Sequence, residues 1–211
     1  MRTTDMTKTP KAALITGAGS GMGAATARRL VRDGWTVTLL GRRPDALEST
    51  AATLAPNHSL VVPTDVADRA AVADAIAAHM ERWGRLDGLV NAAGVAVGGP
   101  ITEVAPEDWH KVIAVNLDGL YHTISQSVPH LVAVKGAVVN ISSVSGLGGD
   151  WGFSPYNASK GAVSNFTRAL ALELGMQGVR VNAVAPSLTR TDMAEFVWQN
   201  EALVDQFRNR L

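Results

Sequence analysis

The chain of 211 residues contains no cysteine. This absence excludes disulfide bonds, thiol nucleophiles and thiolate metal sites, and it fits a reducing compartment. Neither sign of charge dominates, because Lys plus Arg and Asp plus Glu both number 19. A balanced chain has no overall field that would attract nucleic acid or an acidic membrane surface. We therefore expect neither nucleic acid nor a membrane as a partner.

Long apolar runs are also missing. No uninterrupted apolar run approaches the roughly 20 residues of a membrane-spanning helix. Residues 1–10 are polar and rich in threonine, unlike the apolar centre of a signal peptide. We expect a cytoplasmic protein with a polar N-terminal tail over residues 1–10 and one dinucleotide-binding and catalytic domain over residues 11–211. We expect no bound metal, because none of the histidines has metal-ligand spacing: His58, His79, His110, His122 and His130.

Short apolar runs alternate with longer helical stretches along the whole chain. The predicted strands are apolar nearly throughout, which is typical of a parallel sheet with helices on both faces. They cover residues 12–15, 37–40, 60–62, 86–91, 137–141 and 179–184. Helices are predicted over about 21–33, 68–83, from 106 onward and over 154–174. The alternation predicts a single-domain α/β fold with a doubly wound parallel sheet of the Rossmann type.

The second of these helices has a candidate buried face. Ala73, Ile76, Ala77 and Met80 recur at helical spacing and are predicted to form one apolar stripe.

A glycine-rich turn, TGAGSGMG, joins the first predicted strand to the first predicted helix. Glycine permits a tight turn, and the free amides at a helix start bind a pyrophosphate. Such a cluster by itself also fits a flexible loop, but its place between strand and helix favours a dinucleotide site. The residues expected to contact the cofactor here are Gly17, Ser20, Gly21, Met22 and Gly23.

The second predicted strand ends in Gly41-Arg42-Arg43. An enzyme that uses NAD usually has an acidic residue here for the ribose hydroxyls, whereas guanidinium groups bind a 2′-phosphate. The alternative is a pair of solvated surface arginines. We expect Arg42 and Arg43 to contact the cofactor, with NADP(H) preferred and NAD(H) possible.

Tyr156 and Lys160 are four residues apart and share one face of the last predicted helix. A free tyrosine has a pKa of about 10, which is too high for a base at neutral pH. A nearby ammonium stabilises the phenolate, so Lys160 is expected to lower the pKa of Tyr156. Alone, this pattern is also typical of a pair on a surface helix.

These motifs resemble those of the short-chain dehydrogenases/reductases. The spacing Gly17-x3-Gly21-x-Gly23 resembles the fingerprint of that family, and Asn91-Ala92-Ala93-Gly94 looks like its NNAG element. Asn116 lies in a segment similar to its NxxG motif. Of the two serines that follow Ile141, the spacing to Tyr156 matches Ser143 and not Ser142 to the family's catalytic serine.

The resemblance implies a catalytic set of Asn116, Ser143, Tyr156 and Lys160. Tyr156 would be the general acid in reduction and the base in oxidation. Lys160 would bind the nicotinamide ribose, and Ser143 would orient and polarise the carbonyl. Asn116 would hold a water in a proton relay, or it is a helix-kink residue satisfied by backbone. Further cofactor contacts are implied for Asp65, Val66, Asn91, Ala92, Gly94, Tyr156, Lys160 and Pro186. Asp65 also fits a helix N-cap, and Asn91–Gly94 an ordinary strand-to-loop turn.

The implied activity is hydride transfer between a nicotinamide and a small carbonyl compound or secondary alcohol. Residues 143–152 and 186–192 resemble meso-2,3-butanediol dehydrogenases and acetoin reductases of the family, which implies acetoin or a vicinal diol as substrate. The alternatives are a 3-oxoacyl carrier-protein reductase and, in another class, a non-catalytic dinucleotide-binding sensor or scaffold. Trp151 and Phe153 are expected to wall the substrate pocket or to pack in the core.

Two further expectations follow from the resemblance. The long helices from 106 and from 154 would pair between subunits, giving a homodimer or homotetramer. The sequence would lack the last helix and strand of the family.

Overall fold

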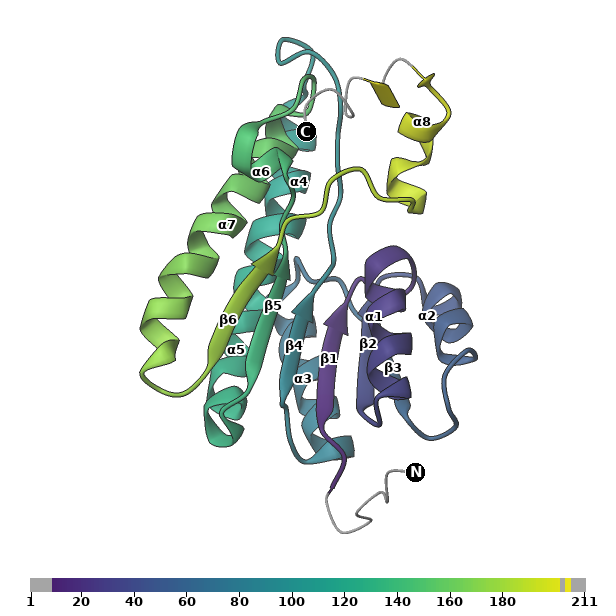
Figure 1. The fold of residues 1–211 in the computed structure, drawn as a ribbon, viewed down its shortest axis with the longest axis vertical. Coiled ribbons are helices and arrows are strands. Elements are labelled where there is room, and N and C mark those ends of the chain that lie inside the picture. The colour runs from purple at the N-terminus through teal and green to yellow at the C-terminus, as the bar shows by residue number, and fades with distance from the viewer. Residues whose placement is uncertain (1–8, 202–203, 206–211) are drawn as a thin grey trace.

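The computed structural model describes residues 9–201 and 204–205. Six parallel strands form one sheet in the order β3-β2-β1-β4-β5-β6 (Figure 1). They are β1 (Ala12–Thr16), β2 (Thr36–Gly41), β3 (Ser59–Pro63), β4 (Gly88–Asn91), β5 (Ala137–Ile141) and β6 (Arg180–Val184). The chain runs outward from β1 to β3 and then returns to lay β4 on the other side of β1. The doubly wound α/β prediction is therefore confirmed, and all six predicted strands are present.

The helical elements alternate with these strands. They are α1 (Gly21–Arg32), α2 (Pro44–Ala51), α3 (Arg69–Trp83), α4 (Pro106–Ile113), the π-helical η1 (Ala114–Asp118), α5 (Gly119–Val134), α6 (Ser145–Gly148), α7 (Ser154–Gly175), the 3-10 turn η2 (Asp192–Ala194) and α8 (Glu195–Trp198). The helix predicted from residue 106 comprises α4, η1 and α5 without a break. The short helices α2, α6 and α8 were not predicted.

The core consists of two apolar layers, one on each face of the sheet. Successive residues of a strand point to opposite faces, so Leu14 and Ile15, both fully buried, belong to different layers. Leu14 packs in the layer that contains residues of α3, α5 and α7. Ile15 packs in the layer that contains residues of α1 and α2. Figure 1 shows α1 in front of the sheet and α5 behind it. Burial on both faces is why the central strands β1, β2 and β4 are largely apolar, whereas the edge strand β6 is mostly exposed.

The buried face of α3 differs from the predicted stripe. Its buried residues are Val72, Ala75, Ile76 and His79. Ala73 and Ala77 are exposed, so that part of the prediction is wrong. Alanine fits either environment, and a histidine was not expected inside.

His79 is held in the interior by hydrogen bonds from both ring nitrogens. Nδ1 lies 2.8 Å from Thr38 Oγ1 on β2, and Nε2 lies 2.9 Å from the carbonyl oxygen of Arg85. Trp83 Nε1 also donates to Thr38 Oγ1 at 3.0 Å. These partners fix the rotation of α3 against the sheet.

The polar tail predicted over residues 1–10 lies outside the described residues, except for the exposed Thr9 and Pro10. Within the described part of the chain, no helix is long and apolar enough to cross a membrane. The same residues contain no cluster of three or more metal-binding side chains.

Candidate active site

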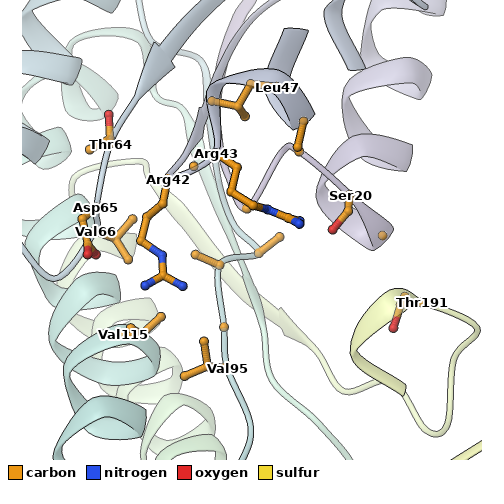
Figure 2. Close-up of a pocket in the computed structure, with 18 residues that line it drawn as sticks. Ser20, Arg42, Arg43, Leu47, Thr64, Asp65, Val66, Val95, Val115 and Thr191 are labelled. Atoms are coloured by element: carbon orange, nitrogen blue, oxygen red, sulfur yellow. The ribbon is translucent and has the colours of Figure 1, made fainter. Parts of the chain in front are cut away.

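Two cavities lie where the loops leave the carboxyl ends of the strands, the usual place for a ligand in an open parallel sheet. The glycine-turn cavity is bounded by the Gly17–Gly21 turn, the end of β2 and the end of β4 (Figure 2). The tyrosine cavity is bounded by Ser143, Tyr156 and the segment after β6. Thr191 lines both cavities.

Nine of the predicted cofactor residues line the glycine-turn cavity: Gly17, Ser20, Gly21, Arg42, Arg43, Asp65, Val66, Ala92 and Gly94. The remaining six, Met22, Gly23, Asn91, Tyr156, Lys160 and Pro186, do not line it. All fifteen contacts remain predictions.

The glycine turn requires its glycines. Gly17 and Gly21 adopt φ of +64° and +51°, a region that side chains disfavour. A Cβ on Gly17 would also lie 2.7 Å from the carbonyl oxygen of Ala92, and one on Gly23 would collide with the carbonyl oxygen of Gly17. Ser20 begins α1 without a side-chain capping bond. The amides of the first turn and the helix dipole therefore fit a negatively charged group such as a pyrophosphate.

Arg42 and Arg43 are exposed and project into the same cavity. Figure 2 shows the guanidinium of Arg42 beside Asp65 and Val66, and that of Arg43 directed toward Ser20. In the part of the chain that the structure describes, the ion pairs are Arg29–Asp33 and Arg85–Asp87, so neither arginine is neutralised there by a carboxylate. The two guanidinium groups fit an anionic substituent on the ligand.

Asp65 lines the cavity but does not cap α3. Its Oδ1 accepts a hydrogen bond from the amide of Ala67 at 3.0 Å. The N-cap of α3 is Asp68, which accepts from the amides of Ala70 and Ala71. The alternative of a helix N-cap at Asp65 is therefore wrong.

Asn91 is buried below the cavity and joins three elements. Its Nδ2 donates to Asn140 Oδ1 of β5 at 3.0 Å, and its Oδ1 accepts from Thr123 Oγ1 of α5 at 2.7 Å. Its side chain therefore fixes β4 in the sheet. Pro186 follows β6, where its carbonyl oxygen accepts from the amide of Val144 at 3.1 Å.

Asn116 lies in the π-helical segment η1, where an extra residue widens the helix. Its Oδ1 accepts from the amide of Val95 at 2.8 Å. Its Nδ2 donates to the carbonyl oxygen of Val95 at 2.9 Å and to Ser159 Oγ at 3.0 Å. The side chain thus ties the segment after β4 to α7, which agrees with the helix-kink alternative. Its water-holding role remains a prediction.

Lys160 is buried, and its Nζ donates to the carbonyl oxygen of Ile141 at 2.6 Å. Burial lowers the pKa of Lys160 to about 8. A Cβ on Gly94 would lie 3.6 Å from this Nζ, so the ammonium sits beside the loop that lines the glycine-turn cavity. Lys160 therefore lies between the end of β5 and the loop after β4, and its side chain lines neither cavity.

Ser143 and Tyr156 face each other in the tyrosine cavity. Ser142 instead bonds to the carbonyl oxygen of Lys160 and to Ser164 Oγ, below the cavity floor. The geometry thus favours Ser143 over Ser142 as the residue that meets a substrate.

The pKa of Tyr156 is shifted in the direction opposite to our prediction. Burial raises it, a hydrogen bond with Ser143 lowers it, and the negative charge of Asp150 raises it further, with a net increase. Lys160 Nζ lies 5.6 Å from the centroid of the tyrosine ring, and Lys160 is not among the groups that shift this pKa. The expectation that Lys160 lowers the pKa of Tyr156 is therefore wrong for this arrangement. A high pKa keeps the hydroxyl protonated and able to donate.

The two aromatic residues before α7 behave differently. Phe153 lines the tyrosine cavity, whereas Trp151 is 66% exposed and belongs neither to the cavity nor to the core. Both expectations for Trp151 were therefore wrong.

Sequence reasoning did not assign Asp150 and Thr191 to the site, although both lie in segments that it singled out. The signal for each was a polar residue in a loop that follows a strand at the carboxyl edge of the sheet.

Residues 11–202 match the short chain dehydrogenase family. The chain belongs to this family and is an oxidoreductase. It is 44% identical to the meso-2,3-butanediol dehydrogenase of Serratia marcescens over 95% of this chain and 79% of that protein.

Two solved structures of reductases have a fold similar to that of this chain. One is a 3-ketoacyl-(acyl-carrier-protein) reductase from Brucella melitensis complexed with NADH, with a TM-score of 0.85 and 31% identity over 88% of this chain and 78% of the other. The other is a point variant of actinorhodin polyketide ketoreductase with NADPH, with a TM-score of 0.86 and 36% identity over 96% of this chain and 78% of the other.

Proposed function

We propose that the chain is an NADP(H)-preferring oxidoreductase that interconverts a small ketone and a secondary alcohol, with acetoin or a related vicinal diol as substrate. The observation that carries this proposal is the pairing of Tyr156 with Ser143 in one cavity, with the buried Lys160 one helical turn after Tyr156 on α7. The likeness to a meso-2,3-butanediol dehydrogenase supports the choice of substrate.

The glycine-turn cavity fits a nicotinamide dinucleotide. The left-handed glycines and the first turn of α1 would hold the pyrophosphate, and Arg42 with Arg43 would hold a 2′-phosphate. A bound nicotinamide supplies or accepts the hydride. Relatives crystallised with NADH and with NADPH support this class of cofactor. The preference for NADP(H) rests on the two arginines alone.

Within the tyrosine cavity, the hydroxyl of Tyr156 would donate its proton to the carbonyl oxygen during reduction. Its raised pKa keeps this hydroxyl protonated at neutral pH, so the proton to be donated is present. Ser143 would hold the substrate oxygen beside that hydroxyl by a hydrogen bond. The ammonium of Lys160 would bind the ribose of the nicotinamide. In oxidation the proton would return from the alcohol to the deprotonated Tyr156.

A second candidate, reduction of a 3-oxoacyl carrier-protein substrate, is favoured by the structural likeness to a 3-ketoacyl reductase. It needs the same catalytic residues. The two functions differ in the substituent next to the reacting carbonyl, which is a hydroxyl-bearing carbon in acetoin and a methylene leading to a thioester in the alternative.

The test is to assay a panel of substrates with each cofactor and to monitor each reaction by the absorbance of the reduced nicotinamide. Acetoin, diacetyl, 2-butanone and an acetoacetyl thioester should be offered with NADPH and NADH. We expect turnover of acetoin with NADPH. Binding of NADPH without turnover of any of these compounds would instead support a dinucleotide-binding sensor or scaffold.

A further inference from the structure

An aromatic side chain forms part of the wall of the tyrosine cavity. Phe153 is the N-cap of α7, three residues before Tyr156, and both side chains line this cavity. Leu188 and Val197, from the segment after β6, add further apolar surface to the wall. The cavity has a volume of about 110 Å³, half the 220 Å³ of the glycine-turn cavity. A substituent on the reacting carbon therefore meets an apolar wall in a small space.

The ring of Phe153 packs against the loop that follows β4. A Cβ on Gly98 would lie 3.1 Å from Cε1 and 3.4 Å from Cζ of this ring. The ring edge therefore occupies the space that a side chain at position 98 would need. Because Gly98 lies outside the cavity and Phe153 lines it, the ring separates the two.

The backbone on both sides of the ring is held by hydrogen bonds. The amide of Gly99 donates to the carbonyl oxygen of Gly152 at 2.8 Å, which joins the loop after β4 to the residue before Phe153. The carbonyl oxygen of Phe153 accepts from the amide of Asn157 at 2.8 Å in the first turn of α7. With Gly98 behind it, the ring has little freedom to move away from a substrate.

Resting on the proposed function, we propose that Phe153, held in place by Gly98, limits the length of the alkyl group that a substrate carries beside its reacting carbon. The ring admits a methyl group and excludes longer chains. The enzyme therefore selects four-carbon hydroxyketones and diols over their longer homologues.

The experiment compares acetoin with propioin, its six-carbon homologue, which carries an ethyl group in place of each methyl group. Both compounds have a hydroxyl next to the carbonyl, so their polar groups are matched. With NADPH, the wild-type kcat/KM is expected to favour acetoin by about 10- to 200-fold, the range for one methylene group in an apolar pocket.

Phe153→Ala removes the ring and should lower this preference by at least about tenfold, through a gain of kcat/KM for propioin relative to acetoin. Trp151→Ala is the matched control, because it removes an exposed aromatic side chain from the same loop and outside the cavity. It should leave the ratio unchanged. Phe153→Leu, which keeps an apolar side chain without the ring, should act in the same direction as Phe153→Ala and replaces it if that variant does not fold.

The contact with Gly98 provides a test in the opposite direction. The backbone of Gly98 is not left-handed, so alanine there is opposed mainly by the ring. Gly98→Ala should press the ring toward the cavity and raise the acetoin preference by about fivefold or more. In a Phe153→Ala background, the same change should leave the ratio nearly unaltered, because the ring that transmits it is gone.

A further readout does not depend on turnover. With saturating NADP⁺, which cannot reduce a ketone, acetoin should raise the Tm of the wild type more than propioin does, and Phe153→Ala should remove that difference.

Equal use of the two ketones by the wild type overturns the inference and leaves the proposed function intact. The same holds for an acetoin preference that is unchanged in Phe153→Ala and Phe153→Leu, and for an effect of Gly98→Ala that persists without the ring. Failure of the wild type to reduce either ketone overturns the proposed function itself.

Discussion

The proposed preference for NADPH over NADH rests on the end of β2, and two substitutions there should reverse it. Gly41 is the last residue of that strand, and Arg42 and Arg43 follow it into the glycine-turn cavity. The perturbation is the double change Gly41→Asp with Arg42→Ala. A carboxylate at 41 would repel a 2′-phosphate and would accept hydrogen bonds from the free ribose hydroxyls of NADH.

The structure tolerates this change. The backbone of Gly41 is not left-handed, and a Cβ there would lie 3.3 Å from Leu47 Cδ2, the far end of a flexible side chain. A shift of a few tenths of an ångström relieves that contact, so the variant should fold. Arg42 is exposed and forms no ion pair in the described residues, so its loss should not damage the core.

The size of the expected preference for NADPH follows from the charge-assisted hydrogen bonds to its 2′-phosphate. Each hydrogen bond between a guanidinium and a phosphate contributes roughly 1.5–3 kcal/mol, and about 1.4 kcal/mol corresponds to a factor of ten. The wild type should therefore prefer NADPH by about ten- to a hundredfold in kcat/KM. The double variant should prefer NADH. Arg42→Ala alone should have a smaller effect, because Arg43 still reaches toward Ser20 (Figure 2).

The assay is kcat/KM for each cofactor at saturating substrate in the wild type, both variants and a control. Arg28→Ala, an exposed arginine of α1 outside the cavity, is the matched control for loss of one positive charge. A wild-type enzyme that uses NADH as well as NADPH, or better, would refute the reasoning about these arginines.

Three other outcomes are expected. Tyr156→Phe should lower kcat by about 10²–10⁴ while the Kd for NADPH, followed by fluorescence, stays nearly unchanged; turnover like that of the wild type would contradict its role as acid. Burial lowers the pKa of His79 to about 4, so the unfolded chain takes up this proton below about pH 6.5 while the folded chain does not. Stability from this source is complete above pH 6.5 and is lost as the pH falls toward 4, by about 2 kcal/mol between pH 7 and 5. Urea unfolding should show that His79→Gln, which cannot titrate, loses correspondingly less over that interval; an equal loss would exclude His79 as the cause. Light scattering at micromolar concentration should give a dimer or tetramer, and Leu172→Lys on α7, where the leucine is 81% exposed, should shift it toward monomer; a monomeric wild type would refute the predicted pairing of the long helices.

The fold was predictable because its central strands are buried on both faces, which leaves short apolar runs that no other arrangement explains as simply. The elements that escaped prediction are short. The helix α2 has eight residues, and α6 has four, so both are shorter than the roughly 11 residues over which a helical apolar pattern can be recognised. The stripe on α3 was misplaced because alanine carries little information about burial, and the buried residue that anchors the helix is a histidine.

The residues of the candidate site also fall into those that the sequence predicted and those that it did not. The motifs placed Tyr156, Lys160 and Ser143 because local spacing along one helix and one strand end is enough to align them. Asp150 and Thr191 were missed because their role depends on loops that converge only after the sheet has formed. The electrostatic expectation for Tyr156 failed for a related reason, since the buried position of its hydroxyl and the distance to Lys160 are properties of the packed structure.

The sequence by itself determined the order of strands and helices, the left-handed glycine turn and the residues that meet at the carboxyl edge of the sheet. These depend on backbone sterics and on apolar periodicity, which act over a few neighbouring residues. Only the tertiary structure decided which groups are desolvated and how Asp150, Ser145 and Ser143 are joined by hydrogen bonds. Desolvation and hydrogen-bond direction arise from atoms far apart in the chain, so they exist only once the chain has packed.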